Sequence, residues 1–347
     1  GGVYAAAVGL NNMNETFNPV TFNNVIFSNN RAVSAEPKGG AIFTTQVNEL
    51  EVSNSLFFNN EANLGGALYL SDWSYVFLDG VTIADNIAPE GAGVYAYWGA
   101  NAVVTNSIIS GNEGDSQITI YETFDANNGT HVSSADISYT NLEGGDAGVI
   151  DIDGGLTWGT GNIDEDPRFR DSENGDYRLF ASSLCINAGN PEDQDEDSTR
   201  RDMGAYPYLN FNWGSARYVS TTGSDIGNSG GSGDPFASIQ AALNATKGQS
   251  HETQTVTVEA GTYYENIIWP IYVEGISLLG AGVGSSIIDG GDQGSVISIE
   301  TWVNGGTASQ IGNDTHISGF TIQNGSDSGI RLVWAGPTLS DLDIRDN

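Results

Sequence analysis

The stretch Phe57-Phe58-Asn59-Asn60, followed by Gly65-Gly66-Ala67-Leu68, contains the pattern that decides the fold. The pattern begins with an aromatic or aliphatic residue, which two spacer residues separate from an Asn. A pair of small residues and an apolar residue follow a few positions later. Further copies are Phe27-Ser28-Asn29-Asn30 with Gly39-Gly40-Ala41-Ile42, Ile83-Ala84-Asp85-Asn86 with Gly91-Ala92-Gly93-Val94, and the start of a fourth, Ile109-Ser110-Gly111-Asn112. The last Asn of successive copies is spaced by 30, 26 and 26 residues. Self-similarity at such a period predicts a repeat architecture.

Each repeat has the length of one coil of a parallel β-helix. Runs rich in β-branched residues, such as 20–27 and 103–109, predict short strands rather than helices. Coils stacked about 4.8 Å apart give every strand two neighbours and join the apolar faces into one core. Glycine permits the sharp corners, and Asn tolerates left-handed backbone while its amide can bond the Asn one coil away. We therefore expect the repeated Asn to be structural, and the insertion 33–38 to lengthen the first coil.

These paired motifs, which cover roughly residues 1–112, resemble the repeats of the polymorphic membrane protein family of bacterial surface proteins. More broadly they resemble parallel β-helix repeats of the pectin-lyase-like superfamily. The resemblance implies an all-β fold, a right-handed parallel β-helix with three sheets. Motifs this short predict fold far more strongly than activity.

Residues 163–208 contain the most specific stretch of the chain. It runs through Ile-Asp-Glu-Asp-Pro-Arg-Phe at 163–169 and Ser-Leu-Cys-Ile-Asn-Ala-Gly-Asn-Pro at 183–191 to Arg-Asp-Met-Gly-Ala-Tyr at 201–206. It resembles the closing segment that follows the last coil of many secreted bacterial and archaeal β-helix proteins, with Asn187 where Asp is commoner. The resemblance implies a secreted protein whose first β-helix closes near residue 208.

An opening segment follows immediately. Residues 255–267 resemble the first coil of pectin-lyase-like proteins, including pectin methylesterases. Ahead of them, Asp234 is expected to be the N-cap and Pro235 the first residue of a short helix. Its apolar stripe consists of Phe236, Ile239 and Leu243. We expect this one short α-helix to cap a β-helix and to hide its open strand edges.

The order of these segments predicts two domains. Residues 1–208 hold the C-terminal part of a β-helix with its closing segment. Residues 209–347 hold the capping segment and first coils of a second β-helix, or of the same helix continued in a neighbouring subunit. The sequence begins with a Gly pair that has no apolar-x-x-Asn unit before it. It stops on an apolar-x-x-Asn unit that has no Gly pair after it, so we expect the two ends to be complementary.

We therefore expect either a window of a long array of modules or a subunit that stacks head to tail on its own copies. Unpaired strand edges accept any strand offered to them, and a head-to-tail contact that does not close produces a filament. The expected assembly interface comprises Gly1, Gly2, Val3, Tyr4, Leu342, Ile344 and Asn347.

An acidic loop is the candidate metal site. Asp193, Asp195 and Asp197 alternate, and Asp202 follows five residues later. Carboxylates at this spacing can surround Ca²⁺, as at the start of an EF-hand loop, although the Gly and the final Glu of that loop are missing. A solvated acidic loop paired with neighbouring arginines accounts for the same pattern. Other acid clusters, at 151–153 and 164–166, are typical of turns.

Aromatic residues suggest a second kind of site. Tyr95, Tyr97 and Trp98 follow a glycine corner, and alternation along a strand turns at least one of them outward. They could stack on the sugars of a surface polysaccharide, or simply pack against the protein.

A carbohydrate-active enzyme is the rival class, because this superfamily includes polysaccharide lyases, hydrolases and esterases. Lyases need a basic residue near calcium, and hydrolases pair Asp residues with a His. The chain has only 11 Lys and Arg residues, and its histidines, His131, His251 and His316, lie far apart in the sequence. We assign no catalytic residue and keep the enzyme or sugar-binding module as the alternative.

Composition sets the remaining limits. The 347 residues include 44 acidic and 11 basic ones, a net charge of −33 that repels nucleic acid and needs screening by salt or divalent cations. Cys185 is the single cysteine, so an internal disulfide is excluded, and we expect it to be buried. The sequence contains no run of 18 apolar residues of the kind that predicts a membrane-spanning helix. We expect a secreted structural or adhesive protein of the cell surface, stabilised by Ca²⁺ and stacked on itself.

Overall fold

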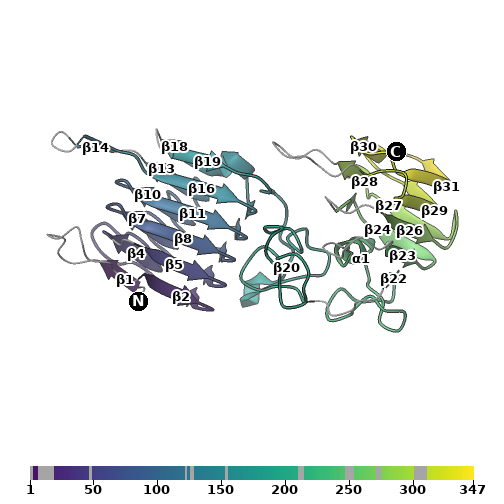
Figure 1. Ribbon diagram of the computed structural model, residues 1–347, viewed down its shortest axis with the longest axis horizontal. Helices are drawn as coiled ribbons and strands as arrows, with labels where there is room; N and C mark the ends of the chain where they lie inside the picture. The colour runs from purple at the N-terminus through teal and green to yellow at the C-terminus, as the bar shows by residue number, and fades with distance from the viewer. Residues whose placement is uncertain are drawn as a thin grey trace.

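The computed structural model describes residues 3–6, 19–46, 49–121, 123–125, 129–152, 155–209, 215–246, 254–270, 275–300 and 311–347. The chain forms two stacks of parallel strands with an irregular segment between them (Figure 1). Strands dominate both stacks, and one short α-helix occurs among the described residues. The predicted all-β parallel β-helix with a short helix is confirmed.

The first stack consists of three sheets, named A, B and C, and successive coils contribute one strand to each in that order, except that the last coil adds none to sheet C. Sheet A contains β1 (Val3–Ala6), β4 (Ile42–Thr45), β7 (Leu68–Ser71), β10 (Val94–Tyr97), β13 (Ile118–Tyr121) and β18 (Val149–Ile152). Sheet B contains β2 (Val20–Asn23), β5 (Leu50–Ser53), β8 (Tyr75–Asp79), β11 (Asn101–Thr105), β16 (Ser134–Ser138) and β19 (Gly155–Trp158). Sheet C contains β3 (Ile26–Ser28), β6 (Leu56–Phe58), β9 (Thr82–Ala84), β12 (Ile108–Ser110) and β17 (Asn141–Leu142). A hairpin of β14 (Thr123–Asp125) and β15 (Gly129–His131) and a 3₁₀ turn at Gly145–Gly148 interrupt the later coils.

The predicted asparagine ladder runs through the first stack. The backbone N and Nδ2 of Asn60 both donate to Oδ1 of Asn86, at 3.0 and 2.8 Å, and Asn86 does the same to Asn112. Asn30 donates in the same way to Asn60, at 3.1 and 2.9 Å. Each amide Nδ2 from Asn60 onward also bonds a carbonyl of the preceding coil. The ladder thus ties successive coils together in one direction.

The two glycines of the pair Gly65-Gly66 are each required for a different reason. Gly65 has φ of 65°, the left-handed region that favours glycine. Gly66 has no room for a side chain, because a Cβ there would lie 2.4 Å from the carbonyl oxygen of Ala92 in the next coil. The corner therefore needs glycine once for conformation and once for close approach.

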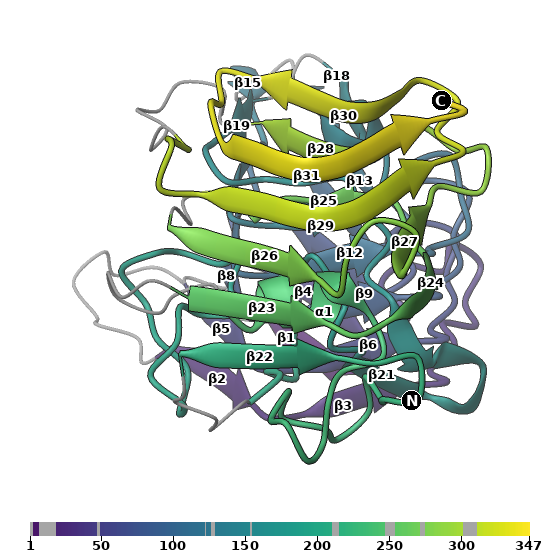
Figure 2. The same cartoon turned by 90° about the vertical axis from the view of Figure 1, so that its right-hand side faces the viewer.

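The second stack is built from fewer but longer strands, which lie parallel in Figure 2. Two of its faces contain β22 (Ala216–Val219), β23 (Gln254–Val258), β24 (Gly261–Tyr264), β26 (Ile276–Gly280), β27 (Ser286–Asp289), β29 (His316–Gln323) and β31 (Thr338–Arg345). The third face contains β25 (Ile267–Ile268), β28 (Ser295–Glu300) and β30 (Ser328–Val333). Strand β29 turns the corner at Gly319, so its first half pairs with β26 and its second half with β27.

The capping helix α1 (Ile239–Asn244) is present, and all six of its residues are buried. Its start differs from the prediction. Ser238 is the N-cap and accepts from the Ala241 amide, whereas Asp234 bonds Ser229 in the preceding loop. Asp234 therefore stabilises a turn, and Pro235 lies outside the helix.

The closing segment lies along the side of the first stack. It contains β20 (Phe169–Asp171), a 3₁₀ turn at Ser172–Asn174 and β21 (Asp176–Leu179), which pair antiparallel. Its buried side chains, which include Tyr177, Cys185 and Met203, pack on the outer face of sheet C at Leu56, Ala84 and Ile108. Cys185 is buried, as predicted.

Candidate functional site

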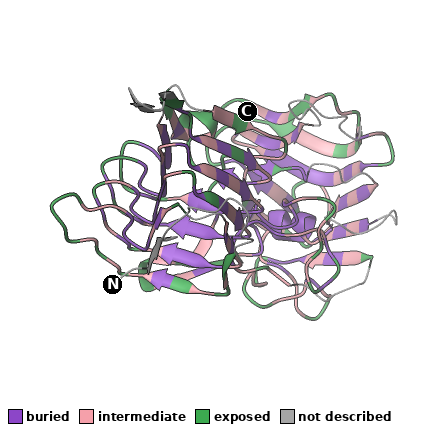
Figure 3. Cartoon of the chain, turned by 60° about the vertical axis from the view of Figure 1, so that its left-hand side comes forward, coloured by how far each residue is buried: buried purple, intermediate pink, exposed green. Residues whose placement is uncertain are grey.

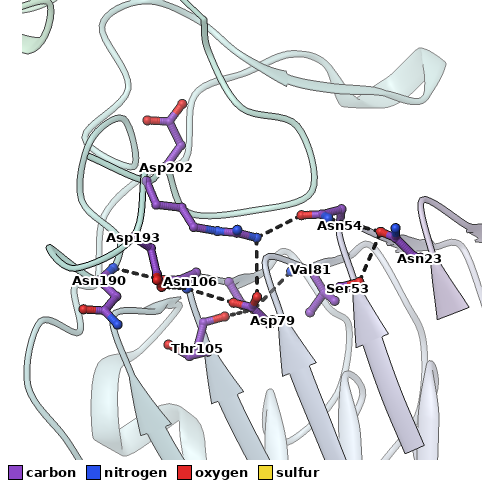
Figure 4. A network of polar contacts seen from close by, with 12 residues as sticks. Asn23, Ser53, Asn54, Asp79, Val81, Thr105, Asn106, Asn190, Asp193 and Asp202 are labelled. Atoms are coloured by element: carbon purple, nitrogen blue, oxygen red, sulfur yellow. Dashed lines mark hydrogen bonds and ion pairs between the residues drawn. The ribbon is translucent and has the colours of Figure 1, made fainter. Parts of the chain in front are cut away.

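The closing segment is fastened to the corner between sheets B and C (Figure 4). Nη2 of Arg201 donates to Oδ1 of Asn54 at 2.9 Å and lies 3.5 Å from Oδ2 of Asp79. At the same corner, Gly80 leaves space for the guanidinium, since a Cβ there would lie 2.4 Å from Nη2. One arginine thus bridges two successive coils.

A second contact of this kind involves Asp193, the first residue of the predicted calcium set. Nδ2 of Asn106 donates to Asp79 at 2.8 Å and to Oδ2 of Asp193 at 3.3 Å. Oδ1 of Asn106 accepts from the Asn190 amide at 2.6 Å. Asp193 therefore faces the first stack, while the labelled carboxylate of Asp202 points away from it in Figure 4.

Asp195 and Asp202 form a close acidic pair inside the closing segment. Oδ2 of Asp195 accepts from the Asp202 amide at 2.8 Å, and the carboxylate of Asp202 accepts from the amides of Asn187 and Tyr208, both at 2.5 Å. Burial raises the pKa of Asp195 to about 6. Burial, and then the charge of Asp195, raise the pKa of Asp202 well above its ordinary value.

The fourth predicted ligand, Asp197, is buried and accepts from the amide and hydroxyl of Thr199, at 3.1 and 2.7 Å. The four aspartates thus lie in three different surroundings: the corner of the first stack for Asp193, the acidic pair for Asp195 and Asp202, and the Thr199 contact for Asp197. In the described ranges, no three His, Cys, Asp or Glu side chains converge as a metal site would require. Calcium binding stays a prediction.

The predicted aromatic site lies on the outer face of sheet A. Phe43, Tyr69 and Tyr95 stack from coil to coil, with ring centroids 5.2 and 5.4 Å apart and nearly parallel planes. The rings of Tyr69 and Tyr95 border a groove of about 500 Å³, which Glu36, Lys38 and Glu90 also line. Because Tyr95 is only 4 % exposed and its ring face lies against Tyr69, it offers little surface to a sugar.

The other two aromatic candidates diverge. Tyr97 is partly exposed, lines the groove and is tilted by 35° from Tyr95. Trp98 has φ of 54° at the corner between sheets A and B, where its ring stacks on His131 at 5.1 Å. Sugar binding by Tyr95, Tyr97 and Trp98 stays a prediction, with Tyr97 the best placed of the three.

The predicted assembly residues that the structure describes lie on the two outermost coils. Gly1 and Gly2 are outside the described residues, and Val3 and Tyr4 are described only as backbone of β1, which pairs on one side with β4. At the other end, Ile344 is 48 % exposed although it continues the inward-facing row that contains the buried Ile322. Figure 3 shows exposed residues along the strands nearest the C-terminus. Within the described ranges, the last coil therefore presents apolar side chains and a strand, β31, that pairs on one side alone.

Glu265 is a functional feature that the sequence analysis missed. Its carboxylate accepts from the amides of Ile239 and Gln240, at 2.8 and 3.0 Å, and so caps α1 from another coil. Burial raises its pKa to about 7. Only the stacking of α1 on the first coil of the second stack places this carboxylate at the helix N-terminus, so no local motif predicts it.

Comparison with known families agrees with this architecture. Residues 221–347 match a family described as a protein of unknown function (DUF1565), and residues 24–45 match the Chlamydia polymorphic membrane protein repeat. No curated protein and no solved structure matches the chain. None of the described helices has the length and apolar character needed to cross a bilayer. Its stacked parallel coils and these two matches identify the chain as a parallel β-helix repeat protein.

Proposed function

We propose that this protein is an extracellular structural component of the cell surface that extends by stacking its last coil on the first coil of another copy. Calcium stabilisation is part of the proposal. The observation that carries it is that Asn347 in the last coil makes the inter-coil bonds typical of a ladder asparagine, while Asn30 begins the ladder in the first coil. A tandem module in a longer polypeptide would use the same two surfaces.

Asn347 lies over Gly325 in the second stack, at the position that corresponds to the ladder asparagines of the first. Its Oδ1 accepts from the Gly325 amide at 2.9 Å, and its Nδ2 donates to the Ile322 carbonyl at 3.2 Å, as the rungs of the first stack do. In those rungs, the backbone N and Nδ2 also donate to Oδ1 of the next Asn. A coil stacked on this position with an Asn in register would offer Asn347 the same acceptor.

Asn30 offers the missing acceptor at the opposite end of the chain. It donates to Asn60 on one side, while no described residue donates to its Oδ1 on the other. Stacking Asn30 on Asn347 would therefore complete the ladder, and would place Phe27 on Ile344 and Ser28 on Arg345. The corners agree, because Asn24 and Asp341 then coincide, with φ of 57° and 49°.

The apolar surface supports the same contact. Leu332, Leu339 and Ile344 of the last coil are 42, 37 and 48 % exposed, and Val20 of the first coil is 39 % exposed. Burying such side chains contributes roughly 25 cal/mol for each Å² removed from water. The open strand edges would gain backbone hydrogen bonds in addition.

Sedimentation velocity in EDTA over a range of protein concentrations tests the stacking. We expect the wild type to form concentration-dependent linear oligomers and Ile344→Asp to remain monomeric, because it would bury a charge against Phe27. Val283→Asp is the matched control, since Val283 is 50 % exposed in a loop of the same stack. A wild type that stays monomeric at high concentration contradicts the proposal.

Engineered disulfides test the register. Adjacent coils lie about 4.8 Å apart, within the Cα separations of roughly 4.4–6.8 Å that a disulfide spans. Chains carrying Ser28→Cys and chains carrying Arg345→Cys should form a mixed dimer on mild oxidation. Replacing Arg345→Cys by Asp343→Cys shifts the pair by two residues and should abolish the dimer. Equal yields from the two pairs would rule out this register.

A further inference from the structure

The groove beside sheet A is lined by two columns of side chains that follow the stacking direction. Lys38, Leu64 and Glu90 form the first column, because they hold the same position in successive coils, directly before a glycine corner. Tyr69 and Tyr95, whose rings stack from coil to coil, form the second. The groove therefore extends across coils, and its volume of about 500 Å³ is typical of sites for small ligands.

An insertion builds one end of this groove. Eight residues separate the ladder asparagine from the glycine pair in the first repeat, at 31–38, whereas four do so in each of the next two. The carbonyl of Pro37 accepts from the amide of Asn63 at 3.0 Å, which anchors the longer loop to the following coil. The loop brings Glu36 and Lys38 to the groove. Stacking alone needs no such loop, since the later coils stack without it.

The polar groups of the groove include both donors and acceptors. Nζ of Lys38 lies 3.7 Å from a carboxylate oxygen of Glu36 and 5.3 Å from the centre of the Tyr69 ring. Glu90 is exposed and forms no ion pair with any residue that the structure describes. Burial, and then the charge of Glu90, raise the pKa of Tyr95 to about 12, so its hydroxyl stays protonated as a donor. Carboxylates beside ammonium and hydroxyl groups suit a ligand rich in hydroxyls.

Tyr97 supplies aromatic surface at the same place. It is partly exposed and lines the groove, and its ring is tilted by 35° from those of Tyr69 and Tyr95, so it does not continue their stack. No described residue bonds its hydroxyl. A tyrosine in this setting can pack its ring on the C–H face of a sugar while its hydroxyl bonds a sugar oxygen.

Charge selects among the sugars. Glu36 and Glu90 against Lys38 leave the groove with one net negative charge, on a chain whose net charge is −33. Like charges repel at short range, so a carboxylated or sulfated glycan is disfavoured. A neutral glycan is not.

We propose that the groove binds a neutral oligosaccharide along the stacking direction, with Tyr97 packed on a sugar ring and Glu90 and Lys38 bonded to its hydroxyls. This site goes beyond the proposed function and is independent of it. It lies on the side of the coils, whereas stacking uses the strand edges of the two end coils. Each copy of the chain would thus hold a polysaccharide on its side without occupying its ends.

Native electrophoresis in gels that contain a polysaccharide tests the ligand class. The neutral probes are mixed-linkage β-glucan, xyloglucan and galactomannan, and the acidic probe is alginate. We expect at least one neutral polymer to retard the protein and alginate to leave its mobility unchanged. The Ile344→Asp background keeps stacking out of the measurement, and sedimentation in EDTA reports on stacking alone. Failure of either proposal is therefore visible separately.

Variants test the site itself, with the affinity for the retarding polymer read from the gels. Tyr97→Ala should lose roughly tenfold in affinity, because it removes the stacking ring. Tyr75→Ala is the matched control, since Tyr75 is 38 % exposed on sheet B, away from the groove. Glu90→Gln should lose several-fold, because a charged acceptor becomes a neutral one. Its control is Glu113→Gln, at an exposed residue outside the groove.

The Tm of each variant shows whether it is folded, and the exposed Glu90 can be changed without disturbing the core. Absence of retardation by all three neutral polymers would overturn the inference, and so would retardation by alginate alone. Equal losses in Tyr97→Ala and Tyr75→Ala, together with equal effects of Glu90→Gln and Glu113→Gln, would show that binding occurs elsewhere on the surface and would overturn it too.

Discussion

Neighbouring residues of each Asn-Asn pair have separate roles. Asn59 has φ of 53° and turns the chain, while the buried Asn60 forms the ladder. Asp85 and Gly111 replace the first Asn in later coils, at φ of 55° and 74°. The second position is Asn in each of the four repeats, and its amide accepts from one coil while it donates to the other.

Glu265 gives the protein an unusual dependence on pH. Burial raises its pKa from 4.5 to about 7, so between these values the folded chain binds more protons than the unfolded chain. Its contribution to stability is therefore complete below pH 4.5 and is lost as the pH rises through 7. At one pKa unit per 1.36 kcal/mol the loss is about 3 kcal/mol.

We expect the urea midpoint in EDTA to fall between pH 5 and pH 8, and Glu265→Gln to reduce this fall. Asp195, whose pKa burial raises to about 6, contributes in the same direction, so some slope should persist in the variant. The control is Glu259→Gln, a change of the same kind at an exposed residue. A slope in Glu265→Gln that equals that of the wild type would show that Glu265 is not the titrating group.

At the scale of elements, the closing segment depends on its contacts with sheet C. Among the strands that the structure describes, β20 and β21 pair with each other alone. The Tyr177 ring is 2 % exposed and packs against Phe58 and Phe169, and its hydroxyl donates to Asp85 at 2.7 Å. Burial and the bond to Asp85 raise the pKa of Tyr177, which keeps the hydroxyl protonated as a donor.

Tyr177→Phe should loosen this element without unfolding the first stack. The variant loses a hydrogen bond to a charged acceptor, for which we expect a loss of about 2 kcal/mol. Limited proteolysis should then cleave between residues 163 and 208 several times faster, while the coils stay intact. Tyr264→Phe, at a residue 76 % exposed, should leave the cleavage rate unchanged. Unaltered proteolysis of Tyr177→Phe would show that the ring alone holds the segment.

At the scale of the whole molecule, two apolar cores share one strongly acidic surface. The core of the first stack includes Phe27, Phe57 and Leu78, and that of the second includes Trp269, Phe236 and Phe320. Bonds between the closing segment and α1, such as Asn244 Nδ2 to the Ser183 carbonyl at 2.7 Å, connect them. With a net charge of −33, repulsion opposes this compact arrangement.

Salt should therefore stabilise the chain. Raising NaCl from 0.02 to 0.3 M at pH 8 in EDTA shortens the Debye length from about 20 to about 6 Å, and we expect the Tm to rise by roughly 5 °C. At pH 4.5, where many carboxylates are protonated, the increase should be much smaller. Scanning calorimetry measures both. Equal increases at the two pH values would point to a general salt effect and not to screening.

Local sequence was enough to predict the coils, the asparagine ladder and the existence of a capping helix. A period of 26–30 residues repeats the same side chains at the same corners, and stacking identical units brings like residues together. Residues such as Asn60 and Gly66 therefore meet neighbours that the repeat itself specifies. The N-cap was wrong at Asp234, because Ser238 and the distant Glu265 satisfy the first amides of α1 instead.

Only the tertiary structure decided where the closing segment lies and which acids meet. Arg201 bonds Asn54, and Asn187 faces Asn244, across 147 and 57 residues of chain. No spacing rule relates such positions, because the segment docks on the side of a completed stack whose corners present Asn and Asp side chains. The alternating aspartates lie apart for the same reason. Asp193 accepts from Asn106 at that corner. The other three, Asp195, Asp197 and Asp202, accept from backbone amides or a hydroxyl within the closing segment.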